Sequence, residues 1–567
     1  MNPIVGALPA NAARIAAMAR QAQAAGAELA IFPELTICGY PPRDLAEKPD
    51  FVAHGQDWLR WASAEVPGIT LICGCLTPAD SRTGKSVHNS AQVLADGEVL
   101  FTQKKMLLPT YDVFDDSRNF APAESQQTWN WRGHRLAITI CEDAWNDKKF
   151  WPRRHARLLY NRDPVAEQMD EGAALLINLS ASPYTTGKMQ VRREMLAALA
   201  AEYRVPVLFV NQVGGNDELV FDGSSQALAP DGEVIARAAS FREDLLLVDL
   251  PGGGRREPEP AEEERALLEA LVLGTRDYVA KCGFRRVVIG LSGGVDSALT
   301  AVIAARALGP EQVLGLALPT RFTSQASLRD AAQLAANLGI ELRTVPIEPM
   351  FAAALASLPP HWAGLPECDP GAITEQNLQS RLRGLTLMAF ANRTGALVLS
   401  TGNKSELATG YCTLYGDMAG GLAVISDLLK TQVYRLCHYL NREQEVIPRT
   451  ILEKAPSAEL RFDQTDQDDL PPYEAVDAVI RGYVENYKTG EQIAAETGLD
   501  ATLVRGLIRR IDRSEYKRQQ AAPGLKVSGK AFGMGRRFPI AQQYEDVPAS
   551  SAASTAAEAI STENRVR

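Results

Sequence analysis

The sequence predicts two α/β domains, the second of them built on a doubly wound parallel sheet. With 567 residues, the chain is too long for one compact domain. Short apolar runs alternate with helical stretches on both sides of a segment that reads PGGGRREPEPAEEE. Because glycines, prolines and charges in this proportion cannot pack a core, the segment is typical of a linker. We therefore predict a first domain over residues 1–250, a linker over 251–264 and a second domain over 265–545.

The elements of the first domain follow from the spacing of its apolar residues. An alanine-rich stretch predicts a helix over residues 11–25. Apolar runs bounded by turn residues predict buried strands over residues 28–32, 68–76, 135–140, 173–178 and 205–211. The pairs Asp96-Gly97 and Asp231-Gly232 are typical of hairpin turns. Together these elements indicate a two-layer α/β arrangement.

The second domain is predicted to begin with an amphipathic helix directly after the linker. A strand over residues 286–291, a glycine turn and a helix from Val295 follow. Strands over residues 312–318, 341–347 and 396–400 each come after a helical stretch, which is the spacing of a doubly wound parallel sheet. From Asp546 the chain has almost no large apolar residues, so residues 546–567 are predicted to form a disordered tail.

The overall composition limits the possible partners. Acidic residues outnumber basic residues by 69 to 59, and the net charge of −10 argues against nucleic acid and favours a small-molecule substrate. The eight cysteines lack the paired spacing of a zinc site and no signal-peptide pattern precedes them, so we expect reduced thiols and a cytoplasmic location. No apolar run in the sequence approaches the roughly 20 residues of a membrane-spanning helix, so no membrane association is expected.

A glycine-rich turn before the helix from Val295 is the most informative segment. Two glycines allow the backbone to approach a polyanion, and N–H groups at the helix N-terminus can hold phosphate oxygens. The hydroxyl groups of Ser292 and Ser297 add donors, and the carboxylate of Asp296 can hold magnesium. The alternative is an ordinary glycine turn that caps a helix. The candidate ATP-binding residues of this loop are Gly290, Leu291, Ser292, Gly293, Gly294, Val295, Asp296 and Ser297.

The loop resembles the pyrophosphate-binding loop of the ATP pyrophosphatase superfamily, whose members cleave ATP between the α and β phosphates. It lacks the Gly-Lys-Ser/Thr of a Walker loop, which argues against a kinase or an ordinary ATPase. Downstream, STGNKSE over residues 400–406 and GYCTLYGD over residues 410–417 are similar to the nucleotide and metal segment of NAD synthetases. The resemblance implies that Thr401 and Lys430 contact ATP and that Asp296 and Glu406 hold Mg²⁺.

The same resemblance implies that the second domain binds deamido-NAD. Asn377 and Arg381 belong to a segment similar to the family's helix that approaches the dinucleotide and ATP, and Glu406 would also lie at the dinucleotide. The late segment PGLKV over residues 523–527 matches the family's lysine segment, so Lys526 would complete the deamido-NAD site. Without the resemblance, each of these residues reads as a helix cap or as a solvated surface charge.

Three separated segments of the first domain point to one chemistry. They are FPE, which ends at Glu34, KKMLLP, which contains Lys105, and ITICED, which contains Cys141. Together they resemble the nitrilase superfamily, which implies an α-β-β-α sandwich with Glu34 as general base, Lys105 as electrostatic stabiliser and Cys141 as nucleophile. A thiol needs a nearby base or cation to become a thiolate, and its tetrahedral intermediate needs a positive partner. Taken singly, the same residues read as a buried cysteine and two surface charges.

A further resemblance connects the first domain to the glutaminases of that superfamily. Tyr111, Ser182 and Lys188 stand where that branch binds glutamine. The two resemblances together imply that ammonia from glutamine is channelled to the second domain. There ATP would adenylate the nicotinate carboxylate of deamido-NAD, and ammonia would displace AMP. The family also implies a homo-oligomer.

The sequence departs from these families at two places. Family members usually have a β-strand before the segment that begins here at Asn2, so we expect the first domain to lack one strand. Asp116 stands where the family commonly has glutamate, so its carboxylate is expected to assist the base from one methylene farther back.

Three other functions fit the sequence less well. GMP and asparagine synthetases combine the ATP loop with different glutaminases, and asparagine synthetase needs a cysteine at the position of Asn2. A thiolating tRNA enzyme would have a basic surface and usually a Cys-x-x-Cys pair, and the sequence has neither. A glutamine or nucleotide sensor without turnover would not need a nucleophile, a base and metal-binding carboxylates together.

Overall fold

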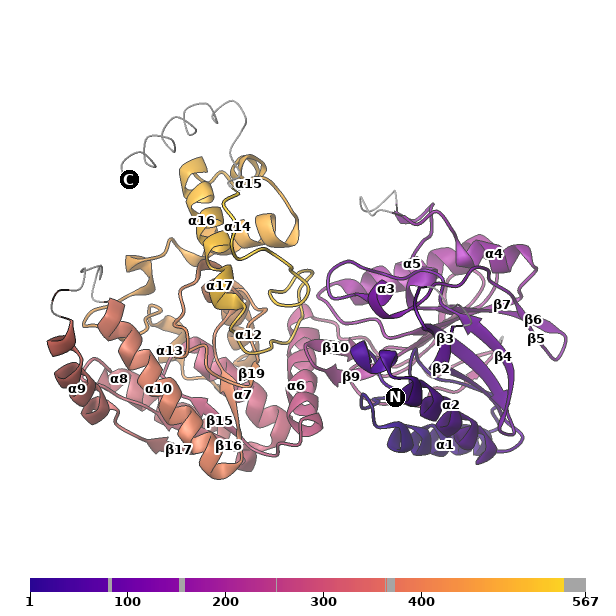
Figure 1. Cartoon of the computed structure of the whole chain (residues 1–567), viewed down its shortest axis with the longest axis horizontal. Coiled ribbons are helices and arrows are strands. Elements are labelled where there is room, and N and C mark those ends of the chain that lie inside the picture. Colours follow the sequence, from indigo (N-terminus) through magenta and orange to yellow (C-terminus); the bar gives the residue numbers. More distant parts are fainter. Residues whose placement is uncertain (80–83, 152–158, 251, 363, 365–372, 545–567) are drawn as a thin grey trace.

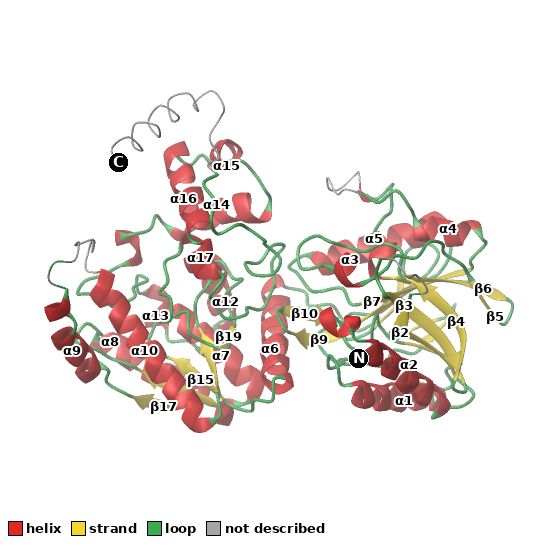
Figure 2. Ribbon diagram, viewed as in Figure 1, coloured by secondary structure: helices red, strands yellow, loops and turns green. Residues whose placement is uncertain are grey.

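The computed structural model describes residues 1–79, 84–151, 159–250, 252–362, 364 and 373–544. Figures 1 and 2 show two α/β bodies that meet along helix α6 (Glu263–Lys281). The tail predicted over residues 546–567 lies outside the described residues. Within the part of the chain that the structure describes, no helix is long and apolar enough to cross a membrane.

The first domain contains two sheets that pack face to face. One sheet has the strand order β1 (Leu29–Ile31), β2 (Thr70–Pro78), β3 (Val87–Ala95), β4 (Glu98–Lys104). The other has the order β12 (Val234–Arg237), β11 (Gln226–Leu228), β8 (Val207–Asn211), β7 (Leu175–Ser180), β6 (His134–Ile140), β5 (Trp129–Trp131). Ile72 and Val93 of the first sheet share one buried cluster with Ile138 and Ile177 of the second. This cluster is the core between the layers.

Helices cover the outer face of each sheet, which completes the predicted α-β-β-α sandwich (Figure 2). The helices on the first sheet are α1 (Leu8–Ala24) and α2 (Pro49–Ala64), and those on the second are α4 (Pro164–Asp170) and α5 (Lys188–Tyr203). Helix α1 begins at Leu8, before the predicted start, because Pro9 fits the first turn of a helix, where its missing N–H is not needed. The predicted Asp96-Gly97 turn joins β3 to β4, and β1 is an edge strand of its sheet.

The second domain has a five-stranded sheet in which all neighbouring strands are parallel. Its order is β17 (Glu341–Thr344), β16 (Val313–Ala317), β15 (Val287–Gly290), β18 (Leu397–Ser400), β19 (Leu422–Ala423). The order runs outward in both directions from β15, as predicted for a doubly wound sheet. Ligands of such sheets bind beyond the carboxyl ends of the strands, where the order reverses. Here that point lies between β15 and β18.

Helices cover both faces of this sheet. Packed with α6 on one face are α7 (Val295–Leu308), α8 (Gln325–Leu338) and α12 (Lys430–Leu440). On the other face lies α10 (Ile373–Thr394), with α9 (Glu348–Ser357) against it. The other helices described in the second domain are α11 (Lys404–Thr409), α13 (Arg449–Glu453), α14 (Tyr473–Ile480), α15 (Gly490–Thr497), α16 (Ala501–Arg513) and α17 (Glu515–Arg518), while the short helix α3 (Asp116–Asn119) belongs to the first domain. Helices α14, α15 and α16 form a separate apolar cluster above α12 (Figure 1).

The domain boundary is more closely packed than the sequence predicts. Within the predicted linker, β14 (Gly253–Gly254) pairs with β13 (Val248–Asp249) of the predicted first domain, and Arg255 forms an ion pair with Asp244 of the first domain at 2.6 Å. Helix α6 packs on two sides, against α7 and against the hairpin of β9 (Val213–Asn216) and β10 (Leu219–Asp222). A side chain at Gly215 would lie 3.0 Å from the Cα of Gly274. Two glycines therefore allow the helix to dock on the hairpin.

Candidate active sites

The three triad candidates of the first domain lie at strand ends, as the sequence predicts. Glu34 comes shortly after β1, Lys105 directly follows β4, and Cys141 directly follows β6. All three are buried, and Cys141, the most exposed, has 5% of its surface accessible. The backbone of Cys141 has a φ of 47°, in the left-handed region, where the strand turns into a short helix. Such strained positions occur mainly at functional sites.

An ion-pair network fixes the carboxylate of Glu34. The Nζ atom of Lys105 lies 2.8 Å from Oε1 of Glu34 and 2.7 Å from Oδ2 of Asp116. Asn89 donates from Nδ2 to Oε1 of Glu34 at 2.7 Å, and the backbone N–H of Ala181 donates to Oε2 at 2.8 Å. Glu34 therefore accepts three hydrogen bonds, one of them from a cation, which holds the carboxylate in one orientation.

The charges of this network set the protonation of the lysine and the cysteine. Burial alone would lower the pKa of Lys105, but the carboxylates of Asp116 and Glu34 hold it well above its ordinary value. Burial raises the pKa of the Cys141 thiol, and the charge of Glu34 adds to this effect while Lys105 opposes it. At neutral pH the resting site therefore contains an ammonium group and a neutral thiol, so the thiol must lose its proton as it attacks.

Two of the three glutamine-binding candidates contact residues that closely follow Cys141 in the chain. The hydroxyl group of Tyr111 donates to Oε2 of Glu142, the residue after the cysteine, at 2.9 Å. The Nζ atom of Lys188 lies 5.4 Å from the centre of the Trp145 ring and donates to a backbone carbonyl. Burial lowers the pKa of Lys188 to about 8. Ser182 is buried, and its backbone N–H donates to Oδ1 of Asn211 at 2.9 Å.

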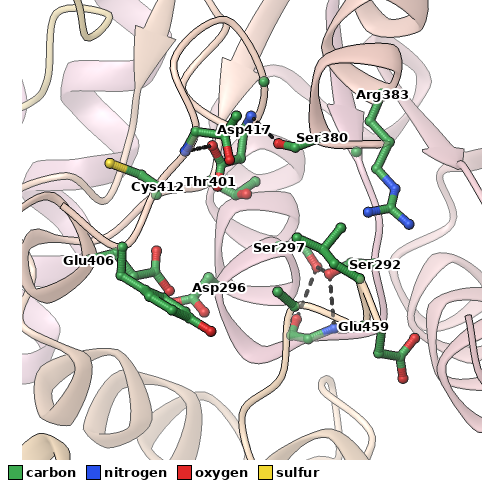
Figure 3. Close-up of a pocket in the computed structure, with 18 of the residues that line it drawn as sticks. Ser292, Asp296, Ser297, Ser380, Arg383, Thr401, Glu406, Cys412, Asp417 and Glu459 are labelled. Carbon is green, nitrogen blue, oxygen red and sulfur yellow. Dashed lines mark hydrogen bonds between the residues drawn. The ribbon is translucent and has the colours of Figure 1, made fainter. Parts of the chain in front are cut away.

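A cavity of about 610 Å³ opens in the second domain at the carboxyl ends of β15 and β18. Residues of the loop from Gly290 to Ser297 line it together with Thr401, Glu406 and Lys430. Figure 3 shows Thr401 and Glu406 among the side chains around the cavity. Gly293 has a φ of 77°, and a side chain there would lie 2.3 Å from the carbonyl oxygen of Ser327. Only glycine fits this position, which explains the glycine that the loop has there.

Two carboxylates and one lysine meet on the wall of this cavity. The Nζ atom of Lys430 lies 2.5 Å from Oδ2 of Asp296 and 3.2 Å from Oε1 of Glu406. Asn403 donates from Nδ2 to the other oxygen of Asp296 at 2.8 Å. Burial raises the pKa of Glu406 to about 8, with the charges of Asp296 and Asp466 adding to the rise and Lys430 opposing it. Figure 3 shows the carboxylates of Asp296 and Glu406 next to each other. The carboxyl groups of Asp296 and Glu406 and the ammonium group of Lys430 therefore lie together on this wall.

The chain matches two family models, one for each domain. Residues 1–257 match the carbon-nitrogen hydrolase model, and residues 267–521 match the NAD synthase model. A glutamine-dependent NAD(+) synthetase of Synechocystis sp. is 46% identical over 554 residues, which cover 96% of this chain and 98% of that protein. The chain belongs to the glutamine-dependent NAD(+) synthetase family. As a member of this family it is an ATP-dependent ligase.

Other members of the glutamine-dependent NAD(+) synthetase family are similar over the same length. The synthetase of Thermotoga maritima is 41% identical over 589 residues, which cover 96% of this chain and 98% of that protein. The solved structure of the synthetase of Acinetobacter baumannii, in complex with ADP, aligns with a TM-score of 0.73 and 36% identity. That alignment covers 97% of this chain and 98% of the other. We therefore refer to the two parts as the glutaminase domain and the synthetase domain.

The structure does not bring every predicted residue of the synthetase domain to the cavity. Asn377 lines it, and its Oδ1 accepts from the hydroxyl group of Thr413 at 2.8 Å. Arg381 lies outside the lining, with Nε donating to the backbone carbonyl of Leu414 at 3.2 Å. Lys526, predicted to bind deamido-NAD, is also outside the lining and has only 2% of its surface exposed. Its Nζ atom lies 3.1 Å from Oδ2 of Asp112 in the glutaminase domain, and its role in binding deamido-NAD stays a prediction.

Two lysines that the sequence did not single out do line the cavity. Lys517 donates from Nζ to the backbone carbonyls of Gly410 and Cys412, each at 2.7 Å. Lys454 donates to the carbonyl of Gly293 in the phosphate loop at 3.2 Å. No local pattern marks either residue, since each comes from a helix end or loop remote in sequence from the segments it contacts.

Proposed function

We propose that the glutaminase domain hydrolyses glutamine to glutamate and ammonia, and that the synthetase domain uses this ammonia to amidate deamido-NAD to NAD. ATP would be converted to AMP and pyrophosphate. The observation that carries the proposal is the presence, in one chain, of the buried Glu34–Lys105 site and the phosphate-loop cavity. Membership of the glutamine-dependent NAD(+) synthetase family supports the same three substrates.

In the glutaminase site, Cys141 attacks the amide carbon of glutamine while Glu34 accepts the thiol proton. The proton passes to the departing nitrogen, ammonia leaves, and a thioester remains. Water, deprotonated by Glu34, then hydrolyses the thioester to glutamate. Lys105 supplies positive charge for the oxyanion of each tetrahedral intermediate, and its raised pKa keeps it charged throughout.

The proposed roles of the glutamine-binding residues follow from the chemistry of their side chains and from their positions in the glutaminase domain. Lys188 supplies a cation for the carboxylate of the substrate, while Tyr111 and Ser182 supply hydrogen-bonding groups. Because the pKa of Lys188 is lowered to about 8, glutamine binding weakens as the pH rises through that value. A loss of glutamine binding as the pH rises above about 8 distinguishes Lys188 from an ordinary surface lysine, whose pKa is higher.

In the synthetase site, the nicotinate carboxylate of deamido-NAD attacks the α-phosphorus of ATP. The backbone N–H groups of the loop, with Ser292 and Ser297, hold the departing pyrophosphate. In this proposal Thr401 and Lys430 contact ATP, and deamido-NAD is bound by Asn377, Arg381, Glu406 and Lys526. Ammonia then attacks the acyl-adenylate, and AMP leaves.

The residues present fit a magnesium ion. Asp296 and Glu406 direct carboxylate oxygens to one point, which Lys430 occupies with its own positive charge. Magnesium at nucleotide sites is held by one or two carboxylates together with phosphate oxygens, and this donor set provides two. When bound, the ion would neutralise charge that develops on the phosphate oxygens.

We also propose that the chain forms a homo-oligomer. Leu385 and Met388 lie on one exposed stripe of α10 and have 60% and 41% of their surfaces accessible, which suits a contact with a second copy. Light scattering during size-exclusion chromatography tests this, since a mass of 61.5 kDa would mean a monomer.

The whole reaction is tested by incubating the protein with ATP, magnesium, deamido-NAD and either glutamine or ammonium. We expect NAD, AMP and pyrophosphate in equal amounts with both nitrogen sources, measured by mass spectrometry. Xanthosine monophosphate serves as a competing acceptor in parallel reactions. Amidation of that acceptor instead of deamido-NAD would contradict the proposed substrate.

A further inference from the structure

One face of helix α10 forms a wall of the nucleotide cavity. Its residues on this wall recur every three or four positions and include Gln376, Asn377, Ser380, Arg383, Gly384 and Leu387. Residues at this spacing lie on the same side of a helix. Among the described residues of α10 that line the cavity, Arg383 is the one with a charged side chain.

The side chain of Arg383 makes one hydrogen bond within the described part of the chain. Its Nε atom donates to the carbonyl of Leu318, just after β16, at 3.2 Å. The two terminal nitrogens donate to no described residue, and the guanidinium group forms no ion pair with a described carboxylate. Figure 3 shows this group extending from the helix into the cavity. The terminal nitrogens are therefore placed to donate to a ligand.

The carboxylates nearest in effect to Arg383 are bonded elsewhere. Burial lowers the pKa of the Arg383 guanidinium group, and the charges of Glu459 and Asp417 oppose this shift. Glu459 accepts from the hydroxyl group of Ser327 at 2.6 Å, and Asp417 accepts from the N–H of Thr413 at 2.6 Å. A guanidinium group stays protonated at neutral pH. Because a charge held away from water without a close partner is unfavourable, this part of the cavity favours an anionic ligand.

Phosphate is the anion that fits a guanidinium group on a cavity wall of this kind. The planar fork of an arginine donates two parallel hydrogen bonds to phosphate oxygens. The phosphate loop lines the same cavity, so nucleotide phosphates are expected there. Lys430, another cation of the lining, is already paired with Asp296 and Glu406, whereas Arg383 has no such neighbour in the described structure.

We propose that Arg383 binds a phosphate group of a nucleotide substrate through its two terminal nitrogens, while the hydrogen bond to Leu318 holds the side chain in place. The inference rests on the proposed function and adds a substrate-binding residue to it. Asn377 and Arg381 of the same helix keep their predicted roles at deamido-NAD. The phosphate belongs to ATP or to the pyrophosphate bridge of deamido-NAD, and the test separates these two sources.

The test measures ligand binding to the full-length parent and to the Arg383→Met variant by calorimetric titration. ATP with magnesium, deamido-NAD and adenosine are titrated separately, so no reaction takes place. We expect Arg383→Met to weaken the binding of ATP or of deamido-NAD about 10- to 100-fold, the range for hydrogen bonds between charged groups. Adenosine carries no phosphate, so its dissociation constant should stay within twofold. Arg383→Lys keeps the charge without the fork and should recover part of the affinity.

Arg393→Met is the matched control. Arg393 is an exposed arginine near the end of the same helix and does not line the cavity. Its substitution should leave all three dissociation constants within twofold of the parent. In steady-state assays, Arg383→Met should raise the KM of the same substrate with glutamine and with ammonium as nitrogen source. Glutamate release from glutamine alone should be unchanged, which shows that the glutaminase domain is folded.

Unchanged binding of both ATP and deamido-NAD in Arg383→Met would overturn the proposal. An equal loss of adenosine and ATP binding would also overturn it, because Arg383 would then support the cavity wall at Leu318 instead of contacting phosphate. If Arg383→Met does not fold, Arg383→Gln, which keeps a donor for Leu318, is titrated in its place. A parent protein that binds neither nucleotide and makes no NAD would refute the proposed function itself. A parent that binds and converts both substrates assigns any failure to the role of Arg383 alone.

Discussion

Lys105→Met is the most informative perturbation of the glutaminase domain, because Lys105 balances two buried carboxylates at once. Glu34 and Asp116 lie 2.8 and 2.7 Å from its Nζ atom and are 0% and 4% exposed. Removing one partner of a buried ion pair costs about 3–5 kcal/mol, since the other charge stays buried without compensation. For a domain of this size that free energy lowers the melting temperature by about 6–20 °C.

The stability of the same variant should depend on pH more strongly than the stability of the parent does. Burial raises the pKa of Asp116, and Lys105 opposes the rise. Without Lys105 the folded-state pKa of Asp116 rises further above its unfolded value, so the folded state binds the proton more tightly. Stability is then lost as the pH rises above the unfolded pKa and is recovered as it falls.

Calorimetry of parent and variant between pH 5 and 8 measures both effects. We expect a larger difference in melting temperature at pH 8 than at pH 5. Asp116→Asn added to Lys105→Met should recover part of the loss, because it removes one of the two buried charges. A melting temperature within about 2 °C of the parent at pH 8 would show that the two buried carboxylates do not need the charge of Lys105.

Three further predictions concern the division of labour between the sites. Cys141→Ala should abolish glutamine-dependent synthesis, leave ammonium-dependent synthesis intact and cost about 1–2 kcal/mol of stability; a parallel loss of both activities, on a preparation that melts cooperatively, would contradict two separate sites. Asp296→Asn should abolish NAD synthesis with either nitrogen source while glutamate release from glutamine persists, and NAD formation at the parent rate would remove Asp296 from the proposed magnesium site. Gly293→Ala should also abolish synthesis with both sources, because its side chain would meet the Ser327 backbone; unchanged pyrophosphate release would show that the loop need not keep its shape.

Much of the fold and of both catalytic centres could be predicted from the sequence, because their signals are local. Cys141 and Lys105 each follow an apolar run that forms a strand, and active-site residues of α/β folds collect at such ends. The phosphate loop is equally local, since strand, glycines and helix are contiguous. Asp116 was noted only as a departure from a family pattern, yet the structure places it beside Lys105 as the second carboxylate of the network.

Features that depend on how the domains dock could not be predicted from the sequence. Helix α6 carries the spacing of an ordinary surface helix, but Gly215 and Gly274 let the hairpin β9–β10 cover its second side. Lys517, in α17, and Lys526 are nine positions apart in the sequence. The path of the chain between them brings Lys517 to the wall of the nucleotide cavity and Lys526 to Asp112 of the glutaminase domain, and no local pattern indicates this difference.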